Sequence, residues 1–350
     1  MTLQEVADSI RSVQDFPKPG ILFFDIESIF KNYEARQVIS DALYQRYKDQ
    51  KIDFVAGFDA RGFPLAQMLA DRLQIGWCQI RKKGKLPPPV ISEDYEKEYG
   101  VDTLEMEDTN ELQGKRVILI DDLIATLGTG AAGVKLVERL GGIVVELVAI
   151  MELPELTIHM LPQIVGRPCL PHTPIHSLIS VIDGKPVANR EYITPEERAR
   201  GIKGVRYCID MITVDEDDTN KLMLLDRIAY TPEDVAGLAM FGGGIDDFES
   251  LITALARELD EEAGCRIAQE TVDYTHVLIG ADRDPRGPQV SYVFHVKTNT
   301  SVARPEKDAG GNIKGNIVMV DLSKEKLPDA SFFAFSDHAT SLTGYTLRAA

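Results

Sequence analysis

Apolar residues in the first half of the chain form short runs that alternate with helix-like segments. The runs lie at residues 54–57, 117–120 and 143–150, and the segments of helical period lie at 35–47, 64–73 and 131–140. Short buried strands that alternate with amphipathic helices are typical of βαβ units. The first half is therefore predicted to be an α/β domain with a mainly parallel sheet flanked by helices, and such sheets bind ligands at the carboxyl ends of their strands.

The second half has strand-like runs around one strongly amphipathic helix. Within residues 247–262 a leucine recurs at every fourth position. Asp246 or Asp247 suits the N-cap of this helix, and Gly264 suits its stop. The strand-like runs cover residues 208–214, 221–229, 290–297 and 317–321. Mixed strands with a crossover helix predict a second α/β domain, with the layers of an α/β/α sandwich.

The region between the two halves is strongly charged and loses its apolar periodicity. Within it, Thr194-Pro195-Glu196-Glu197 predicts a short helix, because it supplies an N-cap, a proline in the first turn and a capping-box glutamate. The predicted organisation is a first domain over residues 1–185, a linker over 186–203 and a second domain over 204–350.

Composition narrows the function classes. The formal charge of −17 argues against nucleic acid and against an anionic membrane surface as partners. The 4 cysteines lie far apart in sequence, as in a protein with reduced thiols. We find neither a targeting segment nor an apolar run long enough to span a membrane, so a cytoplasmic protein that acts on small molecules is expected.

One face of the amphipathic helix carries three carboxylates. Glu258, Glu261 and Glu262 fall at i, i+3 and i+4, where like charges repel unless a hard cation lies among them. Carboxylate oxygens are the ligands that Mg²⁺ prefers, and a bound Mg²⁺ neutralises a diphosphate and lowers the pKa of a bound water. Arg257 and Glu249 lie about two helical turns apart, and we expect them to pair and orient this cluster.

The segment from Gly243 to Cys265 resembles the Nudix box of pyrophosphohydrolases. It reads Gly-x5-Glu-x7-Arg-Glu-Leu-x-Glu-Glu-x-Gly-Cys and fits that signature at every fixed position. The resemblance implies diphosphate hydrolysis, with Gly243 and the three carboxylates at the metal and with Arg257 and the same carboxylates in catalysis. Asp284 and Arg286 belong to a segment that resembles one in Nudix proteins that hydrolyse or sense ADP-ribose.

A second candidate site follows the apolar run 117–120. That run leads into Asp121 and Asp122 and then into a Gly/Thr loop that opens a helix. The amides of such a loop and the dipole of the helix bind a phosphate monoester, whereas the two acids suit ribose hydroxyls and Mg²⁺. The candidate phosphate-binding residues are Ala125, Thr126, Leu127, Gly128 and Thr129.

Residues 15–178 are similar throughout to the adenine phosphoribosyltransferases. The likeness is carried by Asp15-Phe16-Pro17-Lys18-Pro19-Gly20, Phe23-Phe24-Asp25-Ile26, Gly57-Phe58-Asp59-Ala60-Arg61-Gly62-Phe63, Arg81-Lys82-Lys83-Gly84-Lys85-Leu86-Pro87 and Tyr95-Glu96-Lys97-Glu98-Tyr99-Gly100. The resemblance implies a type I phosphoribosyltransferase fold, a homodimer, and transfer of the ribosyl 5-phosphate of PRPP to adenine, which gives AMP and pyrophosphate. By position, it implies pyrophosphate contacts at Arg61, Arg81, Lys82 and Lys85, a lid carboxylate at Glu98, and adenine contacts at Leu22, Phe23 and Asp25.

Two residues depart from that family, so several alternatives stay open. Phe24 stands where the family usually has a basic residue, and Leu127 stands where its phosphate loop usually has glycine; a Cβ there disfavours positive φ. Another base, such as hypoxanthine or nicotinamide, is one alternative. A regulator that binds PRPP or ADP-ribose without turnover is another. His338 is interpreted as a structural histidine.

The leading hypothesis is a bifunctional enzyme of nucleotide salvage. PRPP and adenine are the substrates of the first domain, and ADP-ribose or a related nucleoside diphosphate derivative is the substrate of the second. Both reactions yield AMP, and Mg²⁺ is expected at both sites, with Mn²⁺ as its alternative.

Overall fold

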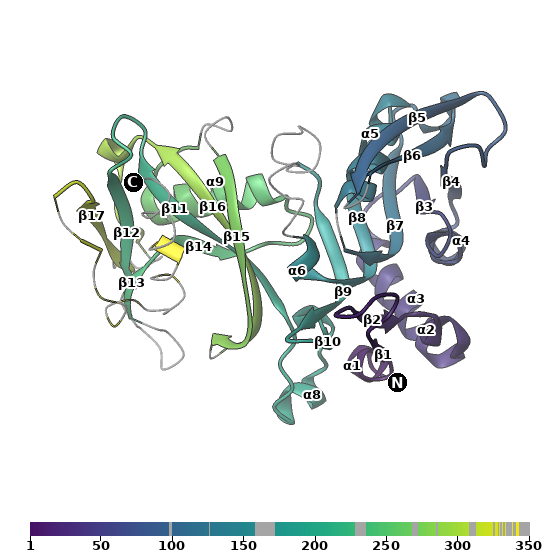
Figure 1. Cartoon of the computed structure of the whole chain (residues 1–350), viewed down its shortest axis with the longest axis horizontal. Helices are drawn as coiled ribbons and strands as arrows, with labels where there is room; N and C mark the ends of the chain where they lie inside the picture. Colours follow the sequence, from purple (N-terminus) through teal and green to yellow (C-terminus); the bar gives the residue numbers. More distant parts are fainter. Residues whose placement is uncertain are drawn as a thin grey trace. The chain divides into compact units, whose positions relative to one another are not determined.

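The computed structural model consists of two compact units, Met1–Val205 and Arg206–Ala350 (Figure 1). The described residues are 1–97, 100–125, 127–157, 172–227, 236–267, 272–284, 286–307, 313–324, 326, 327, 329, 331, 333, 338, 341 and 342. Among them, no helix has both the length and the apolar character needed to cross a bilayer.

The first unit is built on an eight-stranded sheet with the order β10-β9-β8-β7-β3-β4-β6-β5. The five central strands are parallel, and β10, β6 and β5 join antiparallel. The strands are β3 (Phe54–Phe58), β4 (Gly76–Lys82), β5 (Val90–Lys97), β6 (Gly100–Glu107), β7 (Arg116–Ile124), β8 (Ile143–Glu152), β9 (Ile175–Ile182) and β10 (Lys185–Ala188). The mainly parallel sheet and its three predicted apolar strands are confirmed.

The three predicted helices of this unit are also confirmed. They are α3 (Tyr33–Tyr47), α4 (Gly62–Leu73) and α5 (Gly128–Arg139). Shorter elements precede α3 and follow β8, namely α1 (Leu3–Asp8), β1 (Arg11–Gln14), β2 (Leu22–Asp25), α2 (Glu27–Lys31) and α6 (Pro154–Thr157), and η1 (Asn110–Leu112) precedes β7.

Two tight contacts position the carboxyl ends of the central strands. Gly62 begins α4 so close to β7 that an added Cβ would lie 2.6 Å from the carbonyl oxygen of Ile120. The β5–β6 hairpin is joined to α5 by an ion pair between Glu93 and Lys135, at 2.8 Å. The turn after β3 is therefore held close to β7, and α5 is tied to the β5–β6 hairpin.

The residues expected to form a linker, 186–203, lie within the first unit. They contain most of β10, the short helix η3 (Arg190–Tyr192) and α8 (Pro195–Ala199), whose N-cap Thr194 and capping box are as predicted. The Thr2 hydroxyl donates to Glu197 Oε1 at 2.6 Å, and the amide of Ala188 donates to Gln4 Oε1 at 3.0 Å. The charged composition of this segment did not predict its packing, because the segment is held to the unit by hydrogen bonds between polar groups as well as by apolar contacts.

The second unit is a seven-stranded mixed sheet with the order β13-β12-β11-β16-β15, in which β14 also pairs with β11 and β17 with β12. Its strands are β11 (Arg206–Asp215), β12 (Lys221–Arg227), β13 (Gly237–Ala239), β14 (Phe241–Gly244), β15 (Val272–Asp284), β16 (Gly287–Thr298) and β17 (Gly315–Asp321), and η5 (Thr300–Val302) follows β16. The four predicted runs correspond to β11, β12, β16 and β17, although residues 228 and 229 of one run lie outside the described part. The sequence did not predict β14, because a glycine-rich segment disfavours a strand.

The amphipathic helix of this unit is α9 (Leu251–Ala263). Its N-cap is Ser250, whose hydroxyl accepts from the amide of Thr253, so the N-cap expected at Asp246 or Asp247 is wrong. The reason is local: Phe248 has a φ of 59°, and a helix cannot run through a left-handed residue. The predicted stop is confirmed, since Gly264 has a φ of 65°.

Candidate active sites

Arg257 is the organising side chain of the second unit's site. Its Nε and Nη2 donate to the two oxygens of Glu249, both at 2.9 Å, which confirms the expected pairing. Nη2 also donates to the carbonyl of Gly244 at 2.8 Å, and Nη1 donates to Glu258 Oε1 at 2.7 Å. One guanidinium therefore fixes the turn before α9, the end of β14 and a carboxylate of the helix.

The helix presents its three carboxylates at different depths. Glu258 is buried, Glu262 is largely buried, and Glu261 is exposed. Burial raises the pKa of Glu262 to about 8, although its carboxylate accepts from the amide of Gly242 at 2.9 Å. An added Cβ at Gly243 would lie 2.3 Å from Glu258 Oε1, so glycine lets the strand approach this carboxylate.

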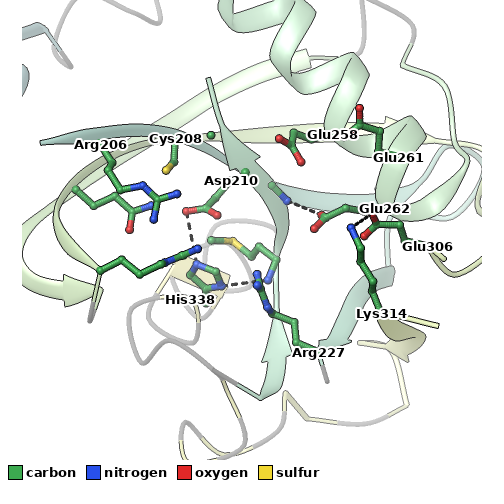
Figure 2. Close-up of a pocket in the computed structure, with 16 residues that line it drawn as sticks. Arg206, Cys208, Asp210, Arg227, Glu258, Glu261, Glu262, Glu306, Lys314 and His338 are labelled. Carbon is green, nitrogen blue, oxygen red and sulfur yellow. Dashed lines mark hydrogen bonds and ion pairs between the residues drawn. The ribbon is translucent and has the colours of Figure 1, made fainter. Parts of the chain in front are cut away.

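These carboxylates face a cavity of about 220 Å³. Figure 2 shows Glu258, Glu261 and Glu262 on one side of it and Arg206, Asp210 and His338 across from them. The predicted residues that line the cavity are Gly243, Glu258, Glu261, Glu262 and Arg286. Side chains of both charges that the sequence did not single out also line it: Arg206, Asp210, Arg227, Glu306 and Lys314.

One part of this lining carried a signal in the sequence. Arg206, Cys208 and Asp210 occupy alternate positions of β11, so they share one face of the strand. Polar residues at alternate positions of an otherwise apolar strand could have marked that face as part of a site. Glu306 and Lys314 carried no such signal, because only the folded chain brings them to the cavity.

His338 is buried, at 2% exposure, and contacts the chain through both ring nitrogens. Nδ1 accepts from the amide of Met240 at 3.1 Å, and Nε2 lies 3.5 Å from Asp210 Oδ2. Asp210 also accepts from the hydroxyl of Ser291, at 2.5 Å. These contacts agree with the interpretation of His338 as a structural histidine.

Glu258, Glu261 and Glu262 form the acidic wall of the cavity, and cationic side chains lie near it in this structure. Arg257 Nη1 is 3.4 Å from Glu261 Oε2, besides its contact with Glu258, and Lys314 pairs with Glu306. In the described part of the chain, no three Asp, Glu, His or Cys side chains converge as closely as the ligands of a bound cation do. The oxygen-rich wall nevertheless offers the donor type that Mg²⁺ prefers, and the residues present fit this ion.

In the first unit, Asp121 and Asp122 lie in the last part of β7, which continues to Ile124, past the predicted run. Asp122 is 8% exposed, and its Oδ2 accepts from Arg61 Nη1 at 3.0 Å, so β7 and the turn after β3 meet. Burial and the neighbouring charge of Asp122 raise the pKa of Asp121 well above its ordinary value. The structure thus joins two of the candidate residues, Arg61 and Asp122, directly.

The loop after these acids leads into α5 through Leu127. Leu127 has a φ of −69° and is 2% exposed, so its side chain occupies the core without the positive φ that only glycine adopts easily. Among the described residues, the N-cap Leu127 provides no side-chain hydrogen bond to the start of α5, and the amides of Gly128 and Thr129 lie in the first turn. Thr126 lies outside the described residues, and Ala125 precedes it at the end of the strand.

The remaining candidates of the first unit are more dispersed. Arg81 Nε lies 3.4 Å from Asp59 Oδ2, and Arg81 Nη1 donates to the carbonyl of Lys85 at 3.3 Å, whereas the side chains of Lys82 and Lys85 are exposed. Glu98 lies outside the described residues. Leu22, Phe23 and Asp25 belong to β2, where Phe24 is buried and Asp25 pairs with Arg11 at 2.8 Å.

Comparison with known proteins finds a family for each unit. Residues 25–160 match the family model of the phosphoribosyl transferase domain, and residues 206–330 match that of the NUDIX domain. The adenine phosphoribosyltransferase of Cupriavidus metallidurans is 52% identical over 149 residues, which make up 43% of this chain and 78% of that protein. The first half of the chain belongs to the adenine phosphoribosyltransferase family.

Other adenine phosphoribosyltransferases are similar to the same half. That of Neisseria meningitidis serogroup B is 46% identical over 156 residues, 45% of this chain and 83% of the relative. The crystal structure of the enzyme from Thermoanaerobacter pseudethanolicus is 42% identical and covers 51% of this chain and 99% of its own, with a TM-score of 0.46. The chain therefore carries a phosphoribosyltransferase followed by a Nudix pyrophosphohydrolase domain, and the predicted α/β fold class is confirmed for both units.

Proposed function

We propose that the chain is a bifunctional enzyme of nucleotide salvage. Its phosphoribosyltransferase domain transfers the ribosyl 5-phosphate of PRPP to adenine, which yields AMP and pyrophosphate. Its Nudix domain hydrolyses ADP-ribose or a related nucleoside diphosphate derivative, which yields AMP and ribose 5-phosphate in the case of ADP-ribose. The observation that carries the proposal is that each unit holds its own charged site, Arg61 with Asp122 in one and Arg257 with its carboxylates in the other.

In the transferase site, the residues divide between the two ends of PRPP. The amides that open α5 suit the 5-phosphate, because a helix start without a side-chain cap binds anions. Asp121 and Asp122 suit the ribose hydroxyls. As pyrophosphate departs, positive charge develops on the ribose and negative charge on the leaving group. The cations Arg61 and Arg81 stabilise that negative charge. Lys82, Lys85 and the lid carboxylate Glu98 complete the proposed set.

In the Nudix site, we assign the metal to Glu258, Glu261 and Glu262, with the backbone of Gly243 beside them. A bound Mg²⁺ supplies charge neutralisation for the diphosphate and acidifies a water. Arg257 holds Glu258 in position, and the N–H of Gly242 holds Glu262. Mg²⁺, with Mn²⁺ as its alternative, is also the proposed cofactor of the transferase site.

The substrate assignment of the Nudix domain is supported by the basic side of the cavity. Arg206, Arg227 and Arg286 line it, and a guanidinium group can bind two phosphate oxygens at once. Arg286 comes from the segment that resembles one in ADP-ribose hydrolases, and the side chain of Asp284 lies outside the described part. A diphosphate with its Mg²⁺ ion matches both signs of charge, because its oxygens suit the arginines and the metal ion suits the acidic wall.

The full-length protein tests both activities in one screen. Adenine, hypoxanthine and nicotinamide compete for PRPP, and mass spectrometry identifies the nucleotide formed; AMP is expected to dominate. A panel of nucleoside diphosphate derivatives with Mg²⁺ is assayed in parallel, and ADP-ribose is expected among the best substrates. Binding of PRPP and ADP-ribose without any product would contradict the proposal and favour a regulator. Light scattering of the same sample tests the homodimer that we also propose.

Replacement of Arg257 by lysine should lower the kcat of ADP-ribose hydrolysis by about 10- to 100-fold with little change in KM. Lysine keeps the charge but loses the fork that holds Glu249, Gly244 and Glu258 together, and a small misplacement of a reacting group costs rate on this scale. Steady-state kinetics measure the effect. Arg266→Lys, at an exposed position outside the cavity, is the control; equal kinetics of the two variants would show that the network does not position the carboxylates.

Binding of Mg²⁺ should release protons and tighten as the pH rises from about 6 to about 8. The pKa of Glu262 is about 8 in the fold against an ordinary 4.5, so between these values the folded, metal-free protein holds a proton that the unfolded chain lacks. Stability from this group is full below about pH 4.5 and is lost as the pH rises toward 8. Titration calorimetry in two buffers of different ionisation enthalpy counts the protons; identical heats in both would refute the linkage.

A further inference from the structure

A second charged pair borders the cavity from outside the Nudix box. Glu306 and Lys314 form an ion pair, and the amide of Lys314 donates to the carbonyl of Glu306 at 3.0 Å. The β-bridge between Lys307 and Ile313 brings these two positions together. Figure 2 shows both side chains next to Glu262, at the end of the acidic wall.

The ammonium of Lys314 faces the acidic wall as well as its partner. The hydrogen bond to Glu306 raises the pKa of Lys314, and the charges of Glu262 and Glu261 raise it further. Arg257 neutralises the other end of the wall through Glu258. In this structure two side-chain cations thus supply the positive charge that crowded carboxylates need.

We propose that Lys314 is an internal competitor of the metal ion and that Glu306 adds to the attraction of the wall for that ion. This inference rests on the proposed function, because it takes the wall of Glu258, Glu261 and Glu262 as the metal site. A divalent cation among these oxygens repels an ammonium at the same wall, so each weakens the binding of the other. Lys314 therefore lowers the affinity of the site for metal.

The same ammonium favours the anionic substrate. Once the wall is neutralised, Lys314 is a cation at the edge of a cavity that must hold a diphosphate, and lysine binds phosphate as a point charge. Loss of Lys314 should therefore change the affinities for the two ligands in opposite directions. The metal ion should bind more tightly, and the diphosphate should bind more weakly. Loss of Glu306 should weaken metal binding. General damage to the fold produces no such pattern, because it weakens both ligands.

Full-length Lys314→Met and Glu306→Gln variants test the inference through the binding of Mn²⁺, followed by the EPR signal of the free ion. We expect Lys314→Met to bind Mn²⁺ about 3- to 30-fold more tightly and Glu306→Gln to bind it more weakly by a similar factor, as for a unit charge at short range in a partly solvated site. The KM of Lys314→Met for ADP-ribose should rise. Lys324→Met, at an exposed lysine that pairs with Asp321, is the matched control and should bind Mn²⁺ as the parent protein does.

The outcomes separate the inference from the function on which it rests. If the parent protein binds one Mn²⁺ and Glu262→Gln loses it, the metal site is supported. Unchanged or weaker Mn²⁺ binding by Lys314→Met would then overturn the proposed competition alone. Mn²⁺ binding that Glu262→Gln retains in full overturns the metal site itself. Lys314→Arg keeps the charge and should keep the parent affinity; a gain there equal to that of methionine would trace the effect to packing and reject the inference.

Discussion

Glutamine at position 262 is expected to lower Mg²⁺-dependent hydrolysis of ADP-ribose by about 10³-fold and to leave the transferase rate unchanged. Glu262 lies one turn after the buried Glu258 on the same helix, and the amide of Gly242 fixes its carboxylate. A neutral amide keeps the size of the side chain but removes a charge that the metal requires. Losses of 10²- to 10³-fold are typical when one preorganised group that stabilises transition-state charge is removed.

Both reactions of the Glu262→Gln protein are measured on one preparation, after circular dichroism has shown a folded chain. Glu216→Gln replaces an exposed acid of the same unit and is the matched control. Hydrolysis by Glu262→Gln at the rate of this control would remove Glu262 from the proposed site.

The complementary change, Asp122→Asn, is expected to lower AMP formation from adenine and PRPP by about 10²- to 10³-fold without slowing hydrolysis. Asp122 is buried, pairs with Arg61 at 3.0 Å and raises the pKa of Asp121. Asparagine removes the charge that anchors Arg61, whose side chain is half exposed, so the guanidinium is no longer held beside β7. The variant therefore loses two proposed functions together: the placement of Arg61 against pyrophosphate and the carboxylate of Asp122 that accepts from the ribose hydroxyls.

Initial rates with PRPP and adenine at saturating Mg²⁺ measure the effect, and Asp108→Asn, at an exposed position of the same unit, controls for loss of an acid. The two variants together test the two-site model. If either one, folded, loses both activities, the sites are not independent and the model is wrong.

Three central strands of the first unit, β3, β7 and β8, could be predicted from the sequence, because they are largely buried. Val117, Ile118 and Leu119 have no exposed surface, so selection for burial leaves an apolar run that is readable without the fold. Strand β14 has no such run. Its glycines are there for the close approach of Gly243 to Glu258, a requirement of the site that the local sequence pattern does not reveal.

Helical periodicity predicts the candidate site where its residues share one element, whereas Gly243, Arg286 and Arg61 are predicted through resemblance to known families. The three carboxylates and Arg257 lie on a single helix, whose period fixes their mutual placement. The N-cap was missed because Asp246 and Glu249 form their own turn, in which the amide of Asp246 donates to the Glu249 carboxylate at 2.9 Å. The place of Lys314 beside the cavity depends on the β-bridge between Lys307 and Ile313, which the sequence does not specify.

The contact between Thr2 and Glu197 brings the two ends of the first unit to one place. A domain whose ends are adjacent can be inserted into another chain, or rejoined end to end and reopened at a loop, without being stretched. The first unit covers residues 1–205, and a version cut at residue 185 would lose most of β10 and the helix α8 that pack near its N-terminal segment. The same adjacency makes a peptide fused before Met1 a neighbour of α8.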